Sequence, residues 1–372
     1  MNTVPELLAA TDRCVKCALC LPHCPTYQLY TNENESPRGR IALAEGLLRG
    51  QLPMDPAVQQ HLDHCVMCQQ CETVCPSQVE YGTIMQGVRE RWPTKSHWSH
   101  PLLRRPRVMQ TLTRIAQSIP SWHRWPLGIR LAQALGNQPK LPAPGIYPSL
   151  RDKTRGRVGL FLGCATQAMQ ASALNATQRL LQTLGYTVVI PPKQGCCGAL
   201  AMHQGNSVAQ RKTQLAQFAE VDTIISTASG CVAGSPFELV EIMTFLAQDP
   251  ETAKVPWQPW SAPVAVHIPC TLRNELSAKQ PLVNLLQHIP GLDMQLLKSS
   301  CCGASGDHML RHPAQAGALR QPLLAQIHGM QVKSVLTSNI GCALHLAEGL
   351  KKTKSPLSVW HPVELMAQCL PA

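Results

Sequence analysis

Apolar runs alternate with amphipathic segments through the second half of the chain. An apolar run at 158–163 precedes the amphipathic segment 177–184, and β-branched runs follow at 187–190 and 223–226. Short apolar or β-branched runs predict strands, and a period near 3.6 residues predicts helices. This part of the chain therefore predicts the order strand, helix, strand, loop, helix, strand.

The same order of elements occurs again about 105 residues later. Strands are predicted at 264–269 and 334–337, and helices at 282–287 and 319–327. A repeat of this length indicates duplication of a domain-sized unit, because solenoid repeats are shorter. Alternating strands and helices predict two tandem, Rossmann-like α/β repeats with parallel sheets.

Each repeat places four cysteines just after its predicted strands. Ligands of open α/β sheets gather at the carboxyl ends of the strands, so we expect the four thiols of each set to converge. A glycine, Gly198 or Gly303, follows the adjacent pair in each set and permits a tight turn. The two sets are Cys164, Cys196, Cys197 and Cys231, and Cys270, Cys301, Cys302 and Cys342.

Spacing alone leaves three kinds of site open for each set. They are a further iron-sulfur cluster, a structural zinc ion held by four cysteines, and a thiol pair that undergoes disulfide chemistry. Adjacent cysteines are awkward ligands for tetrahedral zinc, whose ligands usually stand a few residues apart. Cys369 belongs to neither set and is predicted to be inert.

The N-terminal part carries a different cysteine pattern, and it also occurs twice. The first run is Cys14, Cys17, Cys20 and Cys24-Pro25, and the second is Cys65, Cys68, Cys71 and Cys75-Pro76. In this bacterial ferredoxin spacing, three thiolates hold one [4Fe-4S] cluster and the fourth reaches the other cluster. The predicted ligands are Cys14, Cys17, Cys20 and Cys75 for cluster 1, and Cys24, Cys65, Cys68 and Cys71 for cluster 2.

Zinc and disulfides are the alternatives for these eight cysteines, and both fit poorly. Zinc sites usually use two Cys pairs separated by a loop. Disulfides persist in oxidising compartments, and residues 1–11 have neither the basic nor the apolar region of a signal peptide. We therefore expect a cytoplasmic chain that carries electrons.

A helix is predicted between the two ferredoxin runs. Ser36 suits its N-cap, Pro37 suits the first helical position, and Gly50 suits its end. Arg38 and Arg40 lie in its first turn. They either neutralise the charge of a cluster or are ordinary solvated arginines.

Composition limits the fold and the class of protein. A chain of 372 residues is expected to form two or three domains. With 44% hydrophobic residues and a mean hydropathy of -0.07, it is expected to be soluble. No apolar run approaches the ~18 residues of a transmembrane helix. The segment 89–157 alone contributes +12 to the net charge of +11.

The segment 89–157 is a basic connector that is rich in Pro and contains Trp92, Trp98, Trp122 and Trp125. Docking of a partner is the favoured role, because Trp and Arg are enriched at interface hot spots. Contact with an anionic membrane surface, neutralisation of cluster charge and a plain solvated linker are the alternatives. Nucleic acid is not an expected partner, because no nucleic-acid-binding motif accompanies the charge.

Together these motifs resemble the iron-sulfur subunit of bacterial glycolate oxidase. The resemblance spans the whole chain and is weakest over 89–157. It extends at family level to heterodisulfide reductase, the small subunit of anaerobic glycerol-3-phosphate dehydrogenase and lactate-utilisation proteins. The local strings that carry it are CPTYQL at 24–29, SPRGRI at 36–41, TASGC at 227–231, PCTL at 269–272 and SNIGC at 338–342.

The resemblance implies an electron-transfer subunit of a membrane-associated glycolate dehydrogenase complex. FAD-binding partner subunits would oxidise glycolate to glyoxylate, with D-lactate as a further substrate, and this subunit would pass electrons towards quinone at the cytoplasmic face of the inner membrane. No G-x-G-x-x-G follows a predicted strand, so no flavin or NAD is expected on this chain. Catalytic residues are therefore expected on the partner.

The second half departs from part of that wider group. In heterodisulfide reductase relatives, each closing motif supplies a C-x2-C pair, and five thiols hold a non-cubane cluster. Here Gly234 and His345 stand where the last cysteine of each set would be. Ile268 stands where the related proteins often have the Asp of a His-Asp-Pro-Cys string. His345 and His267 are further candidate ligands near the second set, so a further iron-sulfur cluster is expected in the second CCG repeat rather than in the first.

Three alternative functions follow. The first is the iron-sulfur subunit of a lactate or anaerobic glycerol-3-phosphate dehydrogenase, and the second is a heterodisulfide-reductase-like enzyme with a catalytic Cys-Cys-Gly site. The third is a non-redox interaction protein. The missing fifth thiol favours the electron-transfer subunit over a catalytic Cys-Cys-Gly site.

The predicted organisation is multidomain α/β. A helical module of bacterial-ferredoxin type with two [4Fe-4S] clusters occupies 1–88, and the basic connector occupies 89–157. The two cysteine-rich (CCG) repeats occupy 158–250 and 260–372.

Overall fold

The computed structural model describes residues 2–93, 105–118, 126–206, 216–233, 239–298 and 301–371. The chain divides into two compact units, each assembled from separate stretches of sequence. Unit 1 comprises Met1–Trp98, Ala199–Val208 and Ser300–Gln321, and unit 2 comprises Ser99–Gly198, Ala209–Ser299 and Pro322–Ala372. Each cysteine-rich repeat thus contributes one short segment to unit 1. Trp98, Trp122, Trp125 and Gly234 lie outside the described residues.

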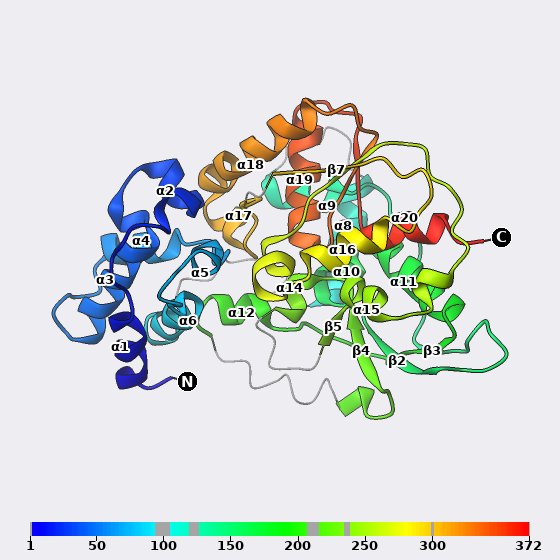
Figure 1. The fold of residues 1–372 in the computed structure, drawn as a ribbon, viewed down its shortest axis with the longest axis horizontal. Coiled ribbons are helices and arrows are strands. Elements are labelled where there is room, and N and C mark those ends of the chain that lie inside the picture. Colours follow the sequence, from blue (N-terminus) through cyan, green and yellow to red (C-terminus); the bar gives the residue numbers. More distant parts are fainter. Residues whose placement is uncertain are drawn as a thin grey trace. The chain divides into compact units, whose positions relative to one another are not determined.

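Unit 1 is helical, and Figure 1 shows its N-terminal helices in blue. Several of these helices begin at a proline, which suits a first helical position because its missing N–H would have no partner there. The helices are α1 (Val4–Asp12), α2 (Pro25–Tyr30), α3 (Pro37–Leu48), α4 (Pro56–Asp63), α5 (Gln70–Thr73), α6 (Tyr81–Arg91), α12 (Ala199–His203) and α17 (His308–Arg311), and α18 (Pro313–His328) begins in this unit.

The predicted helix between the ferredoxin runs is confirmed as α3. The Ser36 Oγ accepts a hydrogen bond of 2.9 Å from the backbone N–H of Gly39, as an N-cap does. Gly50 follows the end of the helix with a φ of 68°, a left-handed conformation that glycine adopts without strain.

The core of unit 1 contains cysteines as well as aliphatic side chains. Leu62, Ile84 and Met85 are almost fully buried, and Cys65 and Cys71 belong to the same cluster. Two of the four cysteines of the second ferredoxin run are therefore held inside the unit.

Unit 2 contains two sheets built on the same plan. In the described residues, the strand orders are β1-β3-β2-β4-β5 and β7-β6-β8-β9, and every pairing is parallel except that of β1 with β3. The central order is the same in both, which confirms the predicted repeat and its parallel sheets. The strands are β1 (Gly145–Tyr147), β2 (Gly156–Phe161), β3 (Tyr186–Ile190), β4 (Thr223–Ser226), β5 (Leu239–Glu241), β6 (Val264–Val266), β7 (Met294–Leu296), β8 (Ser334–Leu336) and β9 (Ser358–Trp360).

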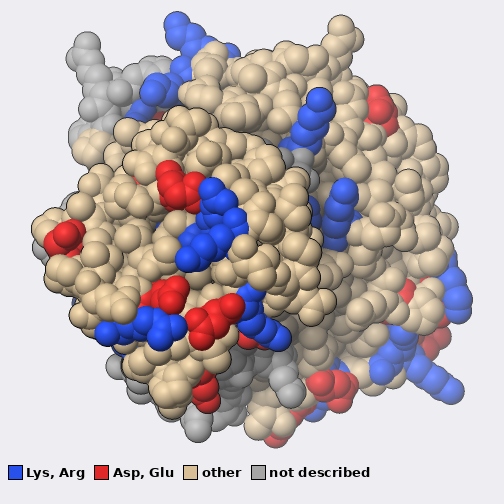
Figure 2. All heavy atoms as spheres, turned by 60° about the vertical axis from the view of Figure 1, so that its left-hand side comes forward, with Lys and Arg blue, Asp and Glu red and all other residues tan. Residues whose placement is uncertain are grey.

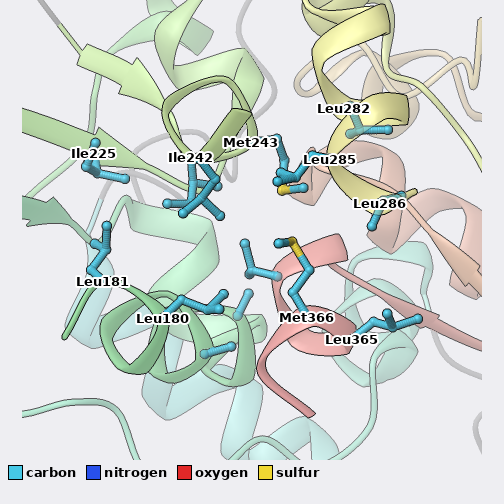
Figure 3. Packing of buried hydrophobic residues seen from close by; sticks show 14 of the residues in the cluster. Leu180, Leu181, Ile225, Ile242, Met243, Leu282, Leu285, Leu286, Leu365 and Met366 are labelled. Atoms are coloured by element: carbon cyan, nitrogen blue, oxygen red, sulfur yellow. The ribbon is translucent and has the colours of Figure 1, made fainter. Parts of the chain in front are cut away.

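The helices of unit 2 bury apolar side chains from both repeats in one core. Figure 3 shows Leu180 and Leu181 of the first repeat on the same core as Leu285 and Met366 of the second. Cys369 is 1% exposed and belongs to this core. The helices are α8 (Pro106–Ser118), α9 (Leu127–Ala134), α10 (Cys164–Met169), α11 (Ala171–Thr183), α14 (Ser229–Val232), α15 (Ile242–Gln248), α16 (Lys279–Leu286), α19 (Ile340–Lys352) and α20 (Pro362–Gln368).

On the face seen in Figure 2, Lys and Arg are interspersed with Asp and Glu on a mostly uncharged surface. None of the helices formed by the described residues combines the length and apolar character that crossing a membrane demands.

Candidate functional site

The cysteines predicted to hold cluster 1 line one cavity of unit 1. Cys14, Cys17 and Cys20 of the first run face it together with Cys75 of the second run, and Cys71, a predicted ligand of cluster 2, borders it as well. Cys17 is exposed, and the other three are partly buried. The structure therefore brings this predicted set together near the surface of the unit.

The cysteines predicted to hold cluster 2 line another cavity of unit 1. Cys65, Cys68 and Cys71 of the second run face it together with Cys24 of the first run. Cys24, Cys65 and Cys71 are each at most 8% exposed. Burial raises the pKa of the Cys71 thiol well above its ordinary value.

Both cysteine runs turn through the same unusual backbone conformation. Lys16 and Ala18 flank Cys17 with φ of 55° and 71°, and Met67 and Gln69 stand at the matching positions with φ of 49° and 54°. Non-glycine residues adopt this left-handed conformation rarely and at an energetic cost, and such residues concentrate at functional sites. No sequence signal marks these positions, because none of them is a glycine or asparagine.

Arg40 is buried beside the second cavity. It is 1% exposed, so the solvated alternative is wrong for this residue. Its Nη1 donates to the Thr26 Oγ1 at 2.9 Å, and Thr26 Oγ1 lies 3.2 Å from the Cys24 Sγ. Burial alone would lower the pKa of Arg40, but Coulombic interactions with the neighbouring acidic groups Tyr81, Cys65, Cys24 and Glu35 raise it above its ordinary value. Arg40 therefore places a permanent positive charge at this cavity.

Glu35 balances that charge, and sequence reasoning missed it. Its Oε1 lies 2.7 Å from the His61 Nδ1 and 2.9 Å from the His64 Nδ1. Burial alone would raise the pKa of Glu35, but hydrogen bonds from the two histidines and the charge of Arg40 lower it. Only its place just before the Ser36 cap could have drawn attention to it.

Arg38 lies at the first cavity and has other partners than Arg40. Its Nε and Nη2 pair with the carboxylate of Glu33 at 2.7 and 3.1 Å, and its Nη1 donates to the Lys16 carbonyl at 2.8 Å. Arg38 thus ties the loop around Cys17 to the start of α3.

The residues around the two cavities fit iron-sulfur clusters. Thiolate sulfur is the donor that such clusters use, and hydrogen bonds to those sulfurs tune their potentials. Tyr81 Oη donates to the Cys65 Sγ at 3.4 Å, which is a contact of that kind. A bound [4Fe-4S] cluster would supply one-electron transfer. No group of His, Cys, Asp or Glu side chains in the described ranges is arranged to hold a single metal ion.

The first set of Cys-Cys-Gly thiols converges within unit 2, as predicted. The Cys164 Sγ lies 3.6 Å from the Cys196 Sγ. Hydrogen bonds with the Cys196 and Cys231 thiols, together with burial, raise the pKa of Cys197. Cys196 thus contacts Cys164 and Cys197, and Cys197 contacts Cys231, beyond the ends of β2, β3 and β4.

The second set divides between the two units. Cys270 and Cys342 belong to unit 2, whereas Cys301 and Cys302 belong to unit 1, so a shared site stays a prediction. Within unit 1, Cys301 packs with Val66 and Leu319. The predicted tight turn after each adjacent cysteine pair is confirmed, because Gly198 and Gly303 have φ of 77° and 76°, in the left-handed region that favours glycine.

The two histidines near the second set are buried. The His267 Nδ1 lies 3.0 Å from the Thr337 Oγ1, and burial lowers the pKa of His267 to about 3. His345 is 2% exposed. His267 is therefore neutral at neutral pH and is fixed by a protein hydrogen bond.

Comparison with known proteins agrees with this arrangement. A family model described as a 4Fe-4S dicluster domain matches residues 10–79, and one described as a cysteine-rich domain matches 158–234 and 264–347. The glycolate oxidase iron-sulfur subunit of Escherichia coli is 30% identical, covering 96% of this chain and 93% of its own.

Two further relatives show how far the similarity extends. The probable glycolate oxidase iron-sulfur subunit of Bacillus subtilis is 29% identical, covering 91% of this chain and 89% of its own. One of the subunits of the dihydromethanophenazine:CoB--CoM heterodisulfide reductase of Methanosarcina barkeri is 22% identical, covering 99% of this chain and 96% of its own.

Proposed function

Because the chain belongs to the family of glycolate oxidase iron-sulfur subunits, we propose that it carries electrons within a membrane-associated glycolate dehydrogenase complex. A partner flavoprotein oxidises glycolate to glyoxylate, releasing two electrons and two protons, and D-lactate is a second substrate. This subunit takes the electrons and passes them towards quinone.

The arrangement of the ferredoxin cysteines carries this proposal. The four predicted ligands of each cluster border one cavity, three from one run and one from the other, and Cys71 borders both cavities. The crossover matches the ligand exchange of two-cluster ferredoxins. Cys14, Cys17, Cys20 and Cys75 would hold cluster 1, and Cys24, Cys65, Cys68 and Cys71 would hold cluster 2.

A further cluster in the cysteine-rich part belongs to the same proposal. The second repeat is its predicted place, and the 3.6 Å contact between the Cys164 and Cys196 sulfurs supports the first repeat as another candidate. The same contact also supports the second candidate function, a heterodisulfide-reductase-like enzyme, because two close thiols can form a disulfide. Iron content separates the two, since a thiol pair needs no iron.

Helix α8 supports a peripheral contact with the membrane. It packs through Met109, Thr113 and Ala116, which are at most 9% exposed, whereas Leu112 and Ile115 are 44% and 53% exposed. The helix contains two arginines, Arg107 and Arg114, directly follows Arg105, and has no acidic residue. Amphipathic helices of this kind lie in the interface of anionic bilayers.

Reduction by substrate tests the electron-transfer role. Protein purified without oxygen is mixed with the flavoprotein and glycolate, and the iron-sulfur signal is followed by electron paramagnetic resonance. We expect reduction that requires both the flavoprotein and glycolate. Reduction by lactate or glycerol 3-phosphate instead of glycolate would make that compound the substrate of the complex. If none of the three reduced the iron-sulfur signal, the electron-transfer role would be refuted.

A further inference from the structure

The loop around Cys17 exposes large apolar side chains. Val15 is 68% exposed and Leu19 is 54% exposed, and each stands two residues from the exposed Cys17. All three line the first cavity. Three of the four predicted ligands at the second cavity are buried, so the predicted ligands at the first cavity are the more exposed set.

The loop that carries these side chains is held in place. Lys16 and Ala18 keep the left-handed conformation on both sides of Cys17. The Lys16 carbonyl accepts a hydrogen bond from Arg38, and the Ala18 carbonyl accepts one from the backbone N–H of Leu21 at 3.0 Å. Val15 and Leu19 are thus presented by an ordered loop, and little conformational entropy would be lost when a partner covers them.

We propose that Val15, Leu19 and Cys17 form the surface on which the electron-donating flavoprotein docks. The inference rests on the proposed function and adds the place of contact. Interfaces combine apolar anchors at the centre with a polar rim. Lys16, within the loop, and Arg13, beside it, are exposed and basic, so the matching surface of the partner is apolar with acidic residues around it.

The position of this surface suits electron transfer. Rates of electron transfer fall steeply with distance, so a donor has to approach the accepting centre closely. Two apolar side chains beside an exposed cysteine allow such an approach, and they exclude water from the contact. A small lipophilic molecule such as a quinone fits this surface less well, because small-molecule sites bury most of their ligand in a concavity.

Binding measurements test the proposal without relying on turnover. The affinity of the anaerobically purified subunit for the flavoprotein is compared between wild type and the double variant Val15→Ser/Leu19→Ser. The matched control is Val4→Ser/Leu29→Ser, which removes two other exposed apolar side chains of unit 1, 36% and 37% exposed. We expect the affinity to fall roughly tenfold or more in the first variant and to change less than about twofold in the control.

Further readouts distinguish the outcomes. If the double variant loses iron, the same binding measurement is made with Lys16→Glu. We expect this variant to bind the flavoprotein more weakly and its binding to depend less on salt. Unchanged affinity in iron-loaded variants would overturn the docking surface while leaving the proposed function intact. A wild-type subunit that neither binds the flavoprotein nor accepts its electrons would refute both. Slower oxidation by quinone with unchanged flavoprotein binding would also overturn the proposal.

Discussion

The Arg40 Nη2 lies 2.5 Å from the Glu35 Oε2, and the two side chains are 1% and 4% exposed. This ion pair stands beside the second cavity of unit 1, which Arg40 itself lines. A buried charge without a partner is expensive, and Glu35 also contacts His61 and His64. Removing the arginine would therefore leave an uncompensated carboxylate inside the unit.

Arg40→Met tests that relationship. We expect it to lower the free energy of unfolding by about 3–5 kcal/mol, measured by urea unfolding of the anaerobically purified protein. Arg49→Met is the matched control, because Arg49 pairs with Glu45 and Asp12 but is 38% exposed, and exposed pairs contribute about 0–1 kcal/mol. Equal losses in the two variants would contradict a structural role for the buried pair.

The exchange of ligands between the two cysteine runs makes a separate prediction. Cys24→Ser and Cys75→Ser should each remove one cluster, lowering the iron content by about four atoms per chain. The spectrum lost in Cys24→Ser should match that lost in Cys68→Ser, because both residues line the second cavity. Cys369→Ser should keep all its iron. If the loss in Cys24→Ser matched that in Cys17→Ser, the crossover would be wrong.

Local elements of this fold follow closely from the sequence. The cap at Ser36, the strand at Thr223–Ser226 and the repeated strand order were predictable, because each depends on nearby side chains or on a periodic pattern. The crossed cysteine sets follow from spacing alone. These features need no knowledge of which distant segments pack together.

Long-range packing could not be predicted in the same way. Residues Ala199–Val208 of the first repeat belong to unit 1, where the Arg89 Nη1 donates to the His203 carbonyl at 2.9 Å. A Cβ at Gly205 would lie 1.8 Å from the Arg89 carbonyl oxygen. Such contacts depend on the final shape of both segments, and Glu35 was missed for the same reason, because its partners come from α3 and α4.

Stability should depend on pH through Glu241, which is 1% exposed in unit 2. Burial raises its pKa from 4.5 to about 8, although hydrogen bonds from Thr244 oppose the rise. Between these two pH values the folded protein holds a proton that the unfolded chain has lost. The free energy of unfolding therefore decreases as pH rises through this range, by up to about 1.4 kcal/mol per pH unit.

Glu241→Gln removes that dependence. Relative to wild type, the variant should gain roughly 2 kcal/mol of stability between pH 6 and pH 8, measured by urea unfolding at both values. The difference between the two proteins isolates Glu241, because the buried histidines affect both equally. A constant difference across this range would show that Glu241 is already ionised in the folded protein.

The exposed apolar side chains of α8 predict binding to anionic bilayers. Wild type should sediment with vesicles that contain phosphatidylglycerol and stay in solution with vesicles of pure phosphatidylcholine, because arginines favour anionic lipid and apolar side chains add burial. Leu112→Ser/Ile115→Ser should lower the partition coefficient roughly tenfold or more, since burying each side chain is worth about 1.5–3 kcal/mol.

The control for that prediction is Ile146→Ser/Leu150→Ser, which removes two side chains of unit 2 that are 63% and 66% exposed. Rising salt should weaken wild-type binding, because ions screen the attraction between arginine and lipid. Equal losses in the two double variants would mean that exposed apolar area in general drives sedimentation, and α8 would lose its special role. Sedimentation that salt does not weaken would show that the arginines do not contribute to lipid binding. If the wild type did not bind anionic vesicles, the exposed face of α8 would instead be a surface for a protein partner.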